Sequence, residues 1–155
     1  MNKNNPEQSG LFNCYCRMID MNEPTELIDK LALIYINDKK LLCTRSYGKD
    51  AWYIPGGKRE AGETDQQTLA REIKEELNVA VDESTIAFYG IFRAQAHGKP
   101  EGVFVQMTCY TAELIGAIAA TSEIEEIAYY GYTDDFVKSP ADVLIFEDLH
   151  SKGLI

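Results

Sequence analysis

The chain has 155 residues, of which 45% are hydrophobic and 26% charged. That size and composition suit one globular domain with a single substantial core. Lys and Arg total 15 against 25 Asp and Glu, so the formal net charge is −10. Binding to a nucleic-acid duplex or to an anionic membrane needs positive charge, so we exclude both as partners. A small anionic ligand is still compatible, because a bound metal ion can reverse the local charge.

The four cysteines, Cys14, Cys16, Cys43 and Cys109, form no C-x-x-C pair, and only two histidines are present. This excludes the usual zinc patterns, and four free thiols favour a reducing compartment. No leader-like segment or long apolar run is visible. We therefore expect a soluble, cytoplasmic protein forming a single domain over 1–155, with 1–10 as a flexible tail. The oligomeric state stays open, a homodimer being one alternative.

The first half predicts short strands. Residues 30–36 and 40–46 are apolar runs joined by the turn "NDK", and 51–54 reads as a third strand that ends at Pro55-Gly56-Gly57. Residues 11–29 carry no clear signal.

A helix is expected over 65–77. Thr64 is a suitable N-cap, and Gln67 three residues later completes a capping box. Asn78 tolerates the left-handed conformation that ends helices. An apolar stripe repeats every four residues, which predicts one buried face; it consists of Leu69, Ile73 and Leu77.

The second half predicts a long hairpin, a further strand and a second helix. The hairpin strands are 86–96 and 103–114, and the next strand is 126–133. Ser139 followed by proline marks a helix start, and the helix should run to Gly153. The order of strands, helix, strands and helix predicts an α/β fold, a mixed sheet with helices on its faces.

Three glutamates crowd the first helix. Glu72, Glu75 and Glu76 form one arc beside the buried stripe, and Glu72 and Glu76 stack about 6 Å apart along the axis. Like charges at this spacing repel by roughly 0.2–0.5 kcal/mol per pair. Convergent carboxylates are the ligands that Mg²⁺ or Mn²⁺ prefers, so we interpret the arc as a metal site. A solvated helix face is the alternative.

The preceding loop adds complementary groups. The Gly56-Gly57 pair permits close backbone approach, so the carbonyl of Gly57 could join the metal ligands. Lys58 and Arg59 suit phosphate oxygens. Glu63 lies near the helix start, and Arg71 could pair with it and hold the loop.

Residues 57–79 resemble the Nudix box, G-x5-E-x7-R-E-U-x-E-E-x-G-U with U a bulky aliphatic residue. The matching residues are Gly57, Glu63, Arg71, Glu72, Ile73, Glu75, Glu76 and Val79. Asn78 replaces the family's glycine and can serve the same helix end. The resemblance implies a Nudix-like α/β/α sandwich and divalent-metal-dependent hydrolysis of a pyrophosphate bond in a nucleoside diphosphate linked to a group X.

The resemblance also implies roles for individual residues. Glu72, Glu75 and Glu76 would be metal ligands, and one of the box glutamates or a carboxylate outside the box would act as base. Glu63 and Arg71 would be mainly architectural. For the catalytic carboxylate outside the box we favour Glu123, on the loop before the last strand, over Glu126. Ordinary surface charge explains either residue equally well.

Substrate choice is less well defined. Ala94 stands where members cleaving ADP-ribose often carry proline, and residues 95–97 lack the tyrosine frequent in enzymes of dinucleoside polyphosphates. Motifs of the coenzyme A and NADH types are fragmentary or missing. By elimination, we expect a nucleoside triphosphate or a related small nucleotide.

Candidate substrate contacts all have an ordinary structural alternative. Trp52 and Tyr53 could stack on a base or simply pack in the sheet. Basic side chains that could reach phosphates, or close over a ligand from the hairpin tip, are Arg45, Lys58, Arg93, His97 and Lys99. Two other functions compete with the enzyme, a catalytically silent Nudix-fold binding or sensor module and a cation buffer. Retention of all the box glutamates favours the enzyme.

Overall fold

The computed structural model describes residues 16–18 and 24–155. The expected tail at 1–10 and Cys14 lie outside the described residues. In chain order the elements are β1 (Cys16–Met18), β2 (Glu26–Ile34), β3 (Ile36–Asn37), β4 (Lys40–Ser46), β5 (Gly56–Gly57), α1 (Asp65–Leu77), β6 (Ala80–Val81), the 3₁₀ helix η1 (Glu83–Thr85), β7 (Ala87–Gln95), β8 (Val103–Thr111), β9 (Leu114–Ile115), β10 (Ile124–Tyr130) and α2 (Pro140–Ser151).

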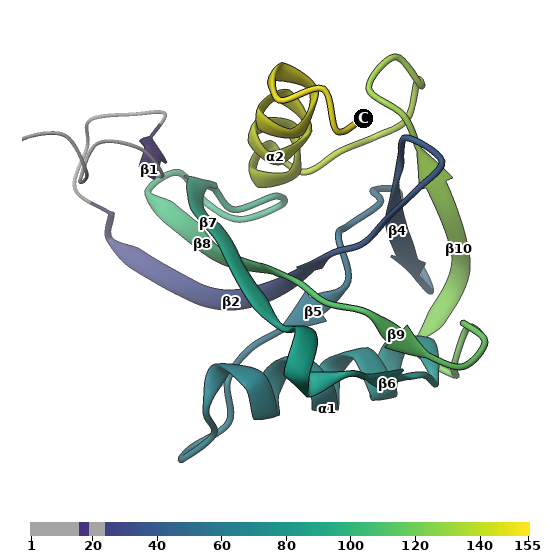
Figure 1. The fold of residues 1–155 in the computed structure, drawn as a ribbon. Helices are drawn as coiled ribbons and strands as arrows, with labels where there is room; N and C mark the ends of the chain where they lie inside the picture. Colours follow the sequence, from purple (N-terminus) through teal and green to yellow (C-terminus); the bar gives the residue numbers. More distant parts are fainter. Residues whose placement is uncertain (1–15, 19–23) are drawn as a thin grey trace, which may run out of the picture.

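The strands form one large mixed sheet and two smaller ones. The five-stranded sheet has the order β1-β7-β8-β2-β5, with β1/β7 and β2/β8 parallel and the other pairs antiparallel. Strands β10, β4 and β3 form a second sheet, and β6 pairs with β9. Helices α2 and α1 lie on opposite sides of the strands, at the top and bottom of the view (Figure 1). The expected α/β/α sandwich is confirmed.

Strand β2 contributes buried side chains to both hydrophobic cores of this sandwich. Ala32 and Ile34 belong to the core under α2, whereas Leu33 belongs to the core over α1. Successive side chains of a strand point to opposite faces, so one apolar run can serve two layers. The buried α1 residues of the second core include the predicted stripe, Leu69, Ile73 and Leu77. Within the described part of the chain, neither helix is long and apolar enough to cross a membrane.

Local signals placed both helices correctly. The Thr64 hydroxyl accepts the Gln67 N–H at 3.2 Å, and the Gln67 side chain accepts the Thr64 N–H at 2.9 Å, so the capping box is present. Asn78 ends α1 with a φ of 52°. Ser139 caps α2 with proline at its first position, as predicted, and α2 ends at Ser151.

Three strand predictions were wrong in their extent. Residues 51–54 form no strand; only isolated bridges join Thr44 to Tyr53 and Trp52 to Lys138. Strand β2 begins at Glu26 and not at residue 30, because its parallel pairing with β8 continues back through residues 26–29, a mixture of charged and apolar residues without the continuous apolar run seen later in the strand. Strand β10 runs 124–130 and not 126–133.

Candidate active site

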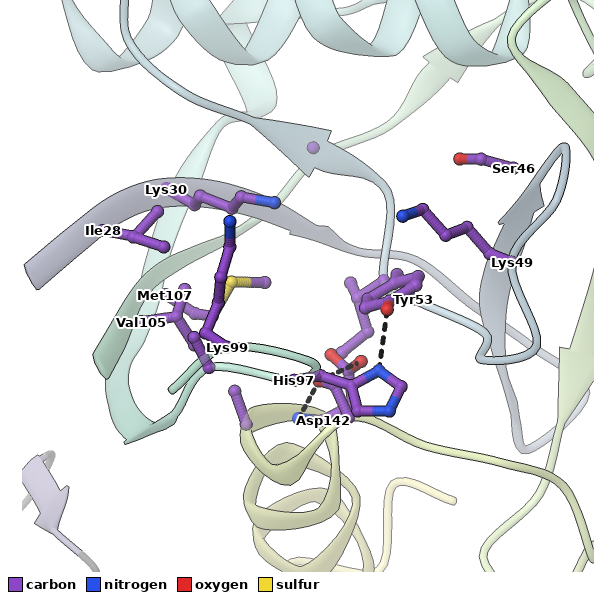
Figure 2. Close-up of a pocket in the computed structure, with 15 residues that line it drawn as sticks. Ile28, Lys30, Ser46, Lys49, Tyr53, His97, Lys99, Val105, Met107 and Asp142 are labelled. Atoms are coloured by element: carbon purple, nitrogen blue, oxygen red, sulfur yellow. Dashed lines mark hydrogen bonds between the residues drawn. The ribbon is translucent and has the colours of Figure 1, made fainter. Parts of the chain in front are cut away.

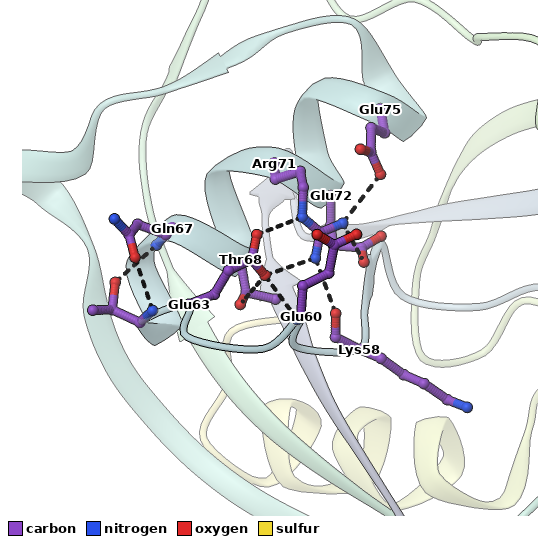
Figure 3. Close-up of polar contacts among 9 residues, drawn as sticks. Lys58, Glu60, Glu63, Gln67, Thr68, Arg71, Glu72 and Glu75 are labelled. Carbon is purple, nitrogen blue, oxygen red and sulfur yellow. Dashed lines mark hydrogen bonds and ion pairs between the residues drawn. The ribbon is translucent and has the colours of Figure 1, made fainter.

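The Arg71 side chain, which extends from α1, connects this helix to the loop that precedes it (Figure 3). Its guanidinium donates two hydrogen bonds to Glu63, at 2.7 and 2.9 Å, and one to the backbone carbonyl of Lys58, at 3.0 Å. It also donates to Glu72 at 2.9 Å and to Glu75 at 3.2 Å. The structure thus brings Glu63 and Arg71 together as the sequence suggested, and the arginine ties loop and helix to each other.

Glu63 is held by several donors at once. Besides Arg71, the Thr68 hydroxyl donates to it at 2.8 Å and the Glu60 N–H at 2.9 Å. Hydrogen bonds to the charged form favour ionisation, so these donors, Arg71 first, lower the pKa of Glu63 to about 2. The same pairing raises the pKa of Arg71. Glu63 is therefore ionised and fully occupied as a loop anchor.

Glu76 has a different environment. Its carboxylate is partly buried and accepts the Gly56 N–H at 3.0 Å. Burial raises the pKa of Glu76 to about 7, and the charges of Glu72 and Glu123 act in the same direction, against Gly56 and Lys30. Glu123, in the turn before β10, is therefore close enough to interact electrostatically with this carboxylate.

The Gly56-Gly57 pair fits this corner because neither residue has a side chain. A Cβ on Gly57 would overlap the carboxylate of Glu72, and one on Gly56 would overlap the carbonyl oxygen of Leu31. Gly56 also has a φ of 145°, a conformation that other residues rarely adopt. Strand β5 thus brings backbone against both Glu72 and Glu76.

The donor set suits a hard divalent cation. Glu72, Glu76 and the Gly57 backbone offer only oxygen ligands, and a cation would offset the repulsion between the two partly buried carboxylates. Among residues 16–18 and 24–155, no three acidic, thiol or imidazole groups already enclose an ion position. Arg71 occupies oxygens of Glu72 and Glu75, and the Glu75 side chain is 51% exposed. The residues fit a metal chemically but are not gathered around one.

Several candidate contacts are paired with other side chains. Arg45 forms ion pairs of 3.0 Å with both Glu125 and Glu126 and lies over the Trp52 ring. This pairing holds Glu126 along β10, while Glu123 has no such partner. Trp52 packs edge-on against Tyr130, with ring centroids 5.1 Å apart.

Two more basic residues are likewise engaged in structural contacts. Arg59 bonds to Asp29 and, at 2.8 Å, to Asp65. Arg93 donates to Gln106 at 2.5 Å. By contrast, the Lys58 side chain is exposed and points away from Arg71 in Figure 3.

A pocket of about 270 Å³ opens beside the glutamates, with Gly56 in its wall. Tyr53 and His97, joined by a 2.8 Å hydrogen bond, line it together with Lys99, so the structure gathers three of the candidate contacts here (Figure 2). It adds residues that the sequence reasoning missed, Lys30, Lys49 and Asp142. Only Asp142 carried a local signal, as the third residue of a capped helix.

The sequence model of the NUDIX domain matches residues 29–141, most of the chain. The chain belongs to the Nudix family. The expected family is thereby confirmed, and with it the class of enzyme, a Nudix pyrophosphohydrolase. Nudix hydrolases generally cleave pyrophosphate bonds in small nucleotide substrates and generally use divalent metal ions.

Solved Nudix structures share the fold. The solution structure of the E. coli ORF135 protein matches with a TM-score of 0.65 at 22% identity, over 81% of this chain and 90% of that one. A putative Nudix hydrolase from Chromobacterium violaceum matches with 0.62 at 23%, over 83% and 79%. The MutT Nudix hydrolase from Burkholderia pseudomallei matches with 0.64 at 19%, over 79% and 97%. No curated protein matches the chain.

Proposed function

We propose that this Nudix protein hydrolyses a pyrophosphate bond of a nucleoside diphosphate-X substrate with Mg²⁺ or Mn²⁺, the leading candidate being a nucleoside triphosphate or a related small nucleotide. The carrying observation is the corner formed by Glu72, Glu76 and the Gly56-Gly57 backbone. The potential metal ligands there are all oxygen atoms, and the two carboxylates repel each other. We further infer a cytoplasmic location, in keeping with the free thiols of Cys43 and Cys109.

The chain's residues divide the work as follows. Glu72, Glu76 and the Gly57 carbonyl would hold the metal ion, and Glu75 would join them when it leaves Arg71. When bound, such an ion neutralises phosphate charge and lowers the pKa of a water molecule. Arg71 and Glu63 keep the loop against α1, which fixes the Gly57 carbonyl in place.

Glu123 would supply a carboxylate from the opposite side. Its charge acts on Glu76, and the described residues form no ion pair with it. In that position it can orient or deprotonate the attacking water. Glu75 and Glu72 remain the alternative bases from the box, as the family pattern implies.

The experiment is a phosphate and pyrophosphate release screen over common nucleotides, with Mg²⁺, with Mn²⁺ and with excess EDTA. We expect turnover of at least one nucleotide with metal and none in EDTA, rising toward alkaline pH, where the attacking water is more easily deprotonated. Full activity in EDTA would rule out the metal-dependent mechanism. Nucleotide binding without turnover would favour the silent binding module.

A further inference from the structure

The pocket beside the glutamates contains charges that the protein itself leaves unmatched. Lys30 comes from β2, Lys49 from the loop after β4, and Lys99 from the β7–β8 hairpin tip. Among the described residues, none of the three ammonium groups has an ion pair or a hydrogen-bond partner. Figure 2 shows all three turned toward the same space. Lys30 is near enough to Glu76 and Asp142 to lower the pKa of both, but no carboxylate among the described residues pairs directly with any of the three lysines. An anionic ligand would therefore stabilise these converging positive charges.

The same pocket contains a buried acceptor. Asp142 is 2% exposed, and its Oδ2 accepts the Ser139 hydroxyl at 2.7 Å. Its Oδ1 is buried and accepts no hydrogen bond of good geometry within the described part of the chain, although the Ile54 N–H lies close enough to the carboxyl to lower its pKa. Leaving a buried polar atom unsatisfied destabilises the folded protein. An N–H donor on a ligand would satisfy it.

Burial raises the pKa of Asp142 to about 6, against the opposing effects of Ser139, of the Ile54 amide and of the Lys30 charge. Above this pH the carboxylate is ionised and can only accept hydrogen bonds. The pocket therefore needs a ligand with an anionic end for the lysines and an N–H donor at its other end.

The remaining walls suit a flat ring. Ile28, Val105 and Met107 provide apolar surface, and the Tyr53 ring provides an aromatic face. The volume of about 270 Å³ is small for a ligand pocket. It therefore suits a single nucleotide base better than the two bases of a dinucleotide. Gly56 lines the pocket and also binds Glu76, so a ligand held here has its phosphates beside the glutamates.

We propose that this pocket selects nucleotides whose base carries an exocyclic amino group, with Asp142 Oδ1 accepting an amino N–H while Lys30, Lys49 and Lys99 bind the phosphates. Adenine, cytosine and guanine each carry such a group, whereas uracil and thymine have carbonyl oxygens at their exocyclic positions. Their ring N3–H is flanked by two of these oxygens, so it cannot approach the carboxylate without bringing an oxygen close to it. A carbonyl oxygen facing an ionised carboxylate is repelled. This inference rests on the proposed function only in taking the ligand to be a nucleotide.

The first test is equilibrium binding at pH 8 in EDTA, by calorimetry, with matched triphosphates. The pairs are CTP with UTP, ATP with ITP, and GTP with ITP, which differ at or beside one amino group. We expect the amino member of at least one pair to bind about tenfold or more tightly, the value of one hydrogen bond to a charged group. Equal affinity within all three pairs, or no binding of any triphosphate, overturns the proposal.

The second test is Asp142→Asn, which keeps an acceptor for Ser139 but removes the charge. A thermal melt first checks that the variant is folded. The preference for the amino member should disappear, while the affinity for inorganic tripolyphosphate should hold or rise, because a negative charge that interacts with Lys30 is removed. A folded variant that keeps the wild-type preference overturns the role of Asp142; if the variant does not fold, the matched pairs on the wild type still decide.

The third test addresses the phosphate end. Lys30→Met and Lys99→Met should each weaken tripolyphosphate and both members of a pair by a similar factor, and so leave the preference intact. Lys40→Met, an exposed lysine beside Asp134, is the matched control and should change nothing. Undiminished tripolyphosphate binding in both pocket variants overturns the lysine assignment. Because no step requires turnover, a protein that discriminates bases but never hydrolyses them would refute the proposed function alone.

Discussion

One group of charged side chains surrounds Arg71 and another lines the pocket at Gly56, and the two groups differ in how many of their charged atoms have a partner. Around Arg71 the anchoring carboxylate of Glu63 accepts several donors within 3 Å. In the pocket, Lys30, Lys99 and one oxygen of Asp142 have no direct partner among the described residues. The paired charges around Arg71 hold the loop in place. The pocket groups that lack a direct partner are available to bind a ligand. Glu76 resembles both groups: it accepts a hydrogen bond from Gly56, but burial raises its pKa and the neighbouring carboxylates add to this effect.

The largest effect is expected at Glu76. Glu76→Gln should lower kcat by roughly 10³-fold, because the site loses a charged oxygen ligand where phosphate charge must be neutralised. The melting temperature without metal should hold or rise, since a partly buried carboxylate repelled by Glu72 is removed. Turnover assays with Mg²⁺ and melts in EDTA check both. A large fall in the metal-free melting temperature would instead make Glu76 a structural residue.

Arg71→Ala should destabilise the fold clearly more than removal of a surface ion pair does, as well as impair turnover. The variant leaves Glu63, whose side chain is only 18% exposed, without its main partner. The matched control is Arg45→Ala, whose acidic partners are more exposed, and it should cost about 1 kcal/mol or less. Urea unfolding measures both. A double-mutant cycle with Glu63→Ala that proved additive would show that Arg71 and Glu63 do not interact.

Glu123→Gln should lower kcat by about 10²-fold with little change in stability, as suits a group that orients or deprotonates water. Glu126→Gln is the matched control on the same segment. Its carboxylate is paired with Arg45, so its removal should cost far less activity. Steady-state kinetics of the two variants decide the ranking, and a reversed order would transfer the role to Glu126.

The smallest effect concerns Asp142 and pH. The pKa of its carboxyl is about 6 in the folded protein, above its ordinary value of 3.8, so the folded state binds more protons between these values. Stability from this group is therefore present at pH 4 and is lost as pH rises through 6. Relative to Asp142→Asn, the wild type should lose about 2 kcal/mol between pH 4 and 7.5. Urea unfolding at both pH values measures this, and a constant difference would show that the burial penalty is absent.

The sequence predicted well what is determined by neighbours along the chain. The capping box at Thr64, the left-handed Asn78 and the start of α2 at Ser139 all depend on residues within one turn. The strand predicted at 51–54 was wrong because an apolar run can be buried by packing alone. Ala51 and Ile54 are buried, but this segment makes only isolated bridges and no strand ladder. The parallel pairing of β2 with β8 joins segments far apart in sequence, and no local pattern encodes it.

The same distinction explains the site. Glu63, Arg71, Glu72 and Glu76 lie within one loop and helix, so their spacing could be read directly from the sequence. The pocket collects single residues from β2, from the β4 and β7–β8 loops and from α2. Each of them is an ordinary lysine or aspartate in its own segment. Only the assembled fold shows that they share one space and lack partners.

The hydrogen bond from Gly56 to Glu76 also gives the molecule a built-in spectroscopic reporter. The Gly56 N–H donates to the Glu76 carboxylate, and the same residue lines the pocket. Selective ¹⁵N-glycine labelling would give at most 11 backbone amide signals, because the chain has 11 glycines. One of these resonances should shift when Mg²⁺ is titrated in and shift again when a nucleotide is added. A single NMR peak could thus follow the order in which metal and substrate enter the enzyme.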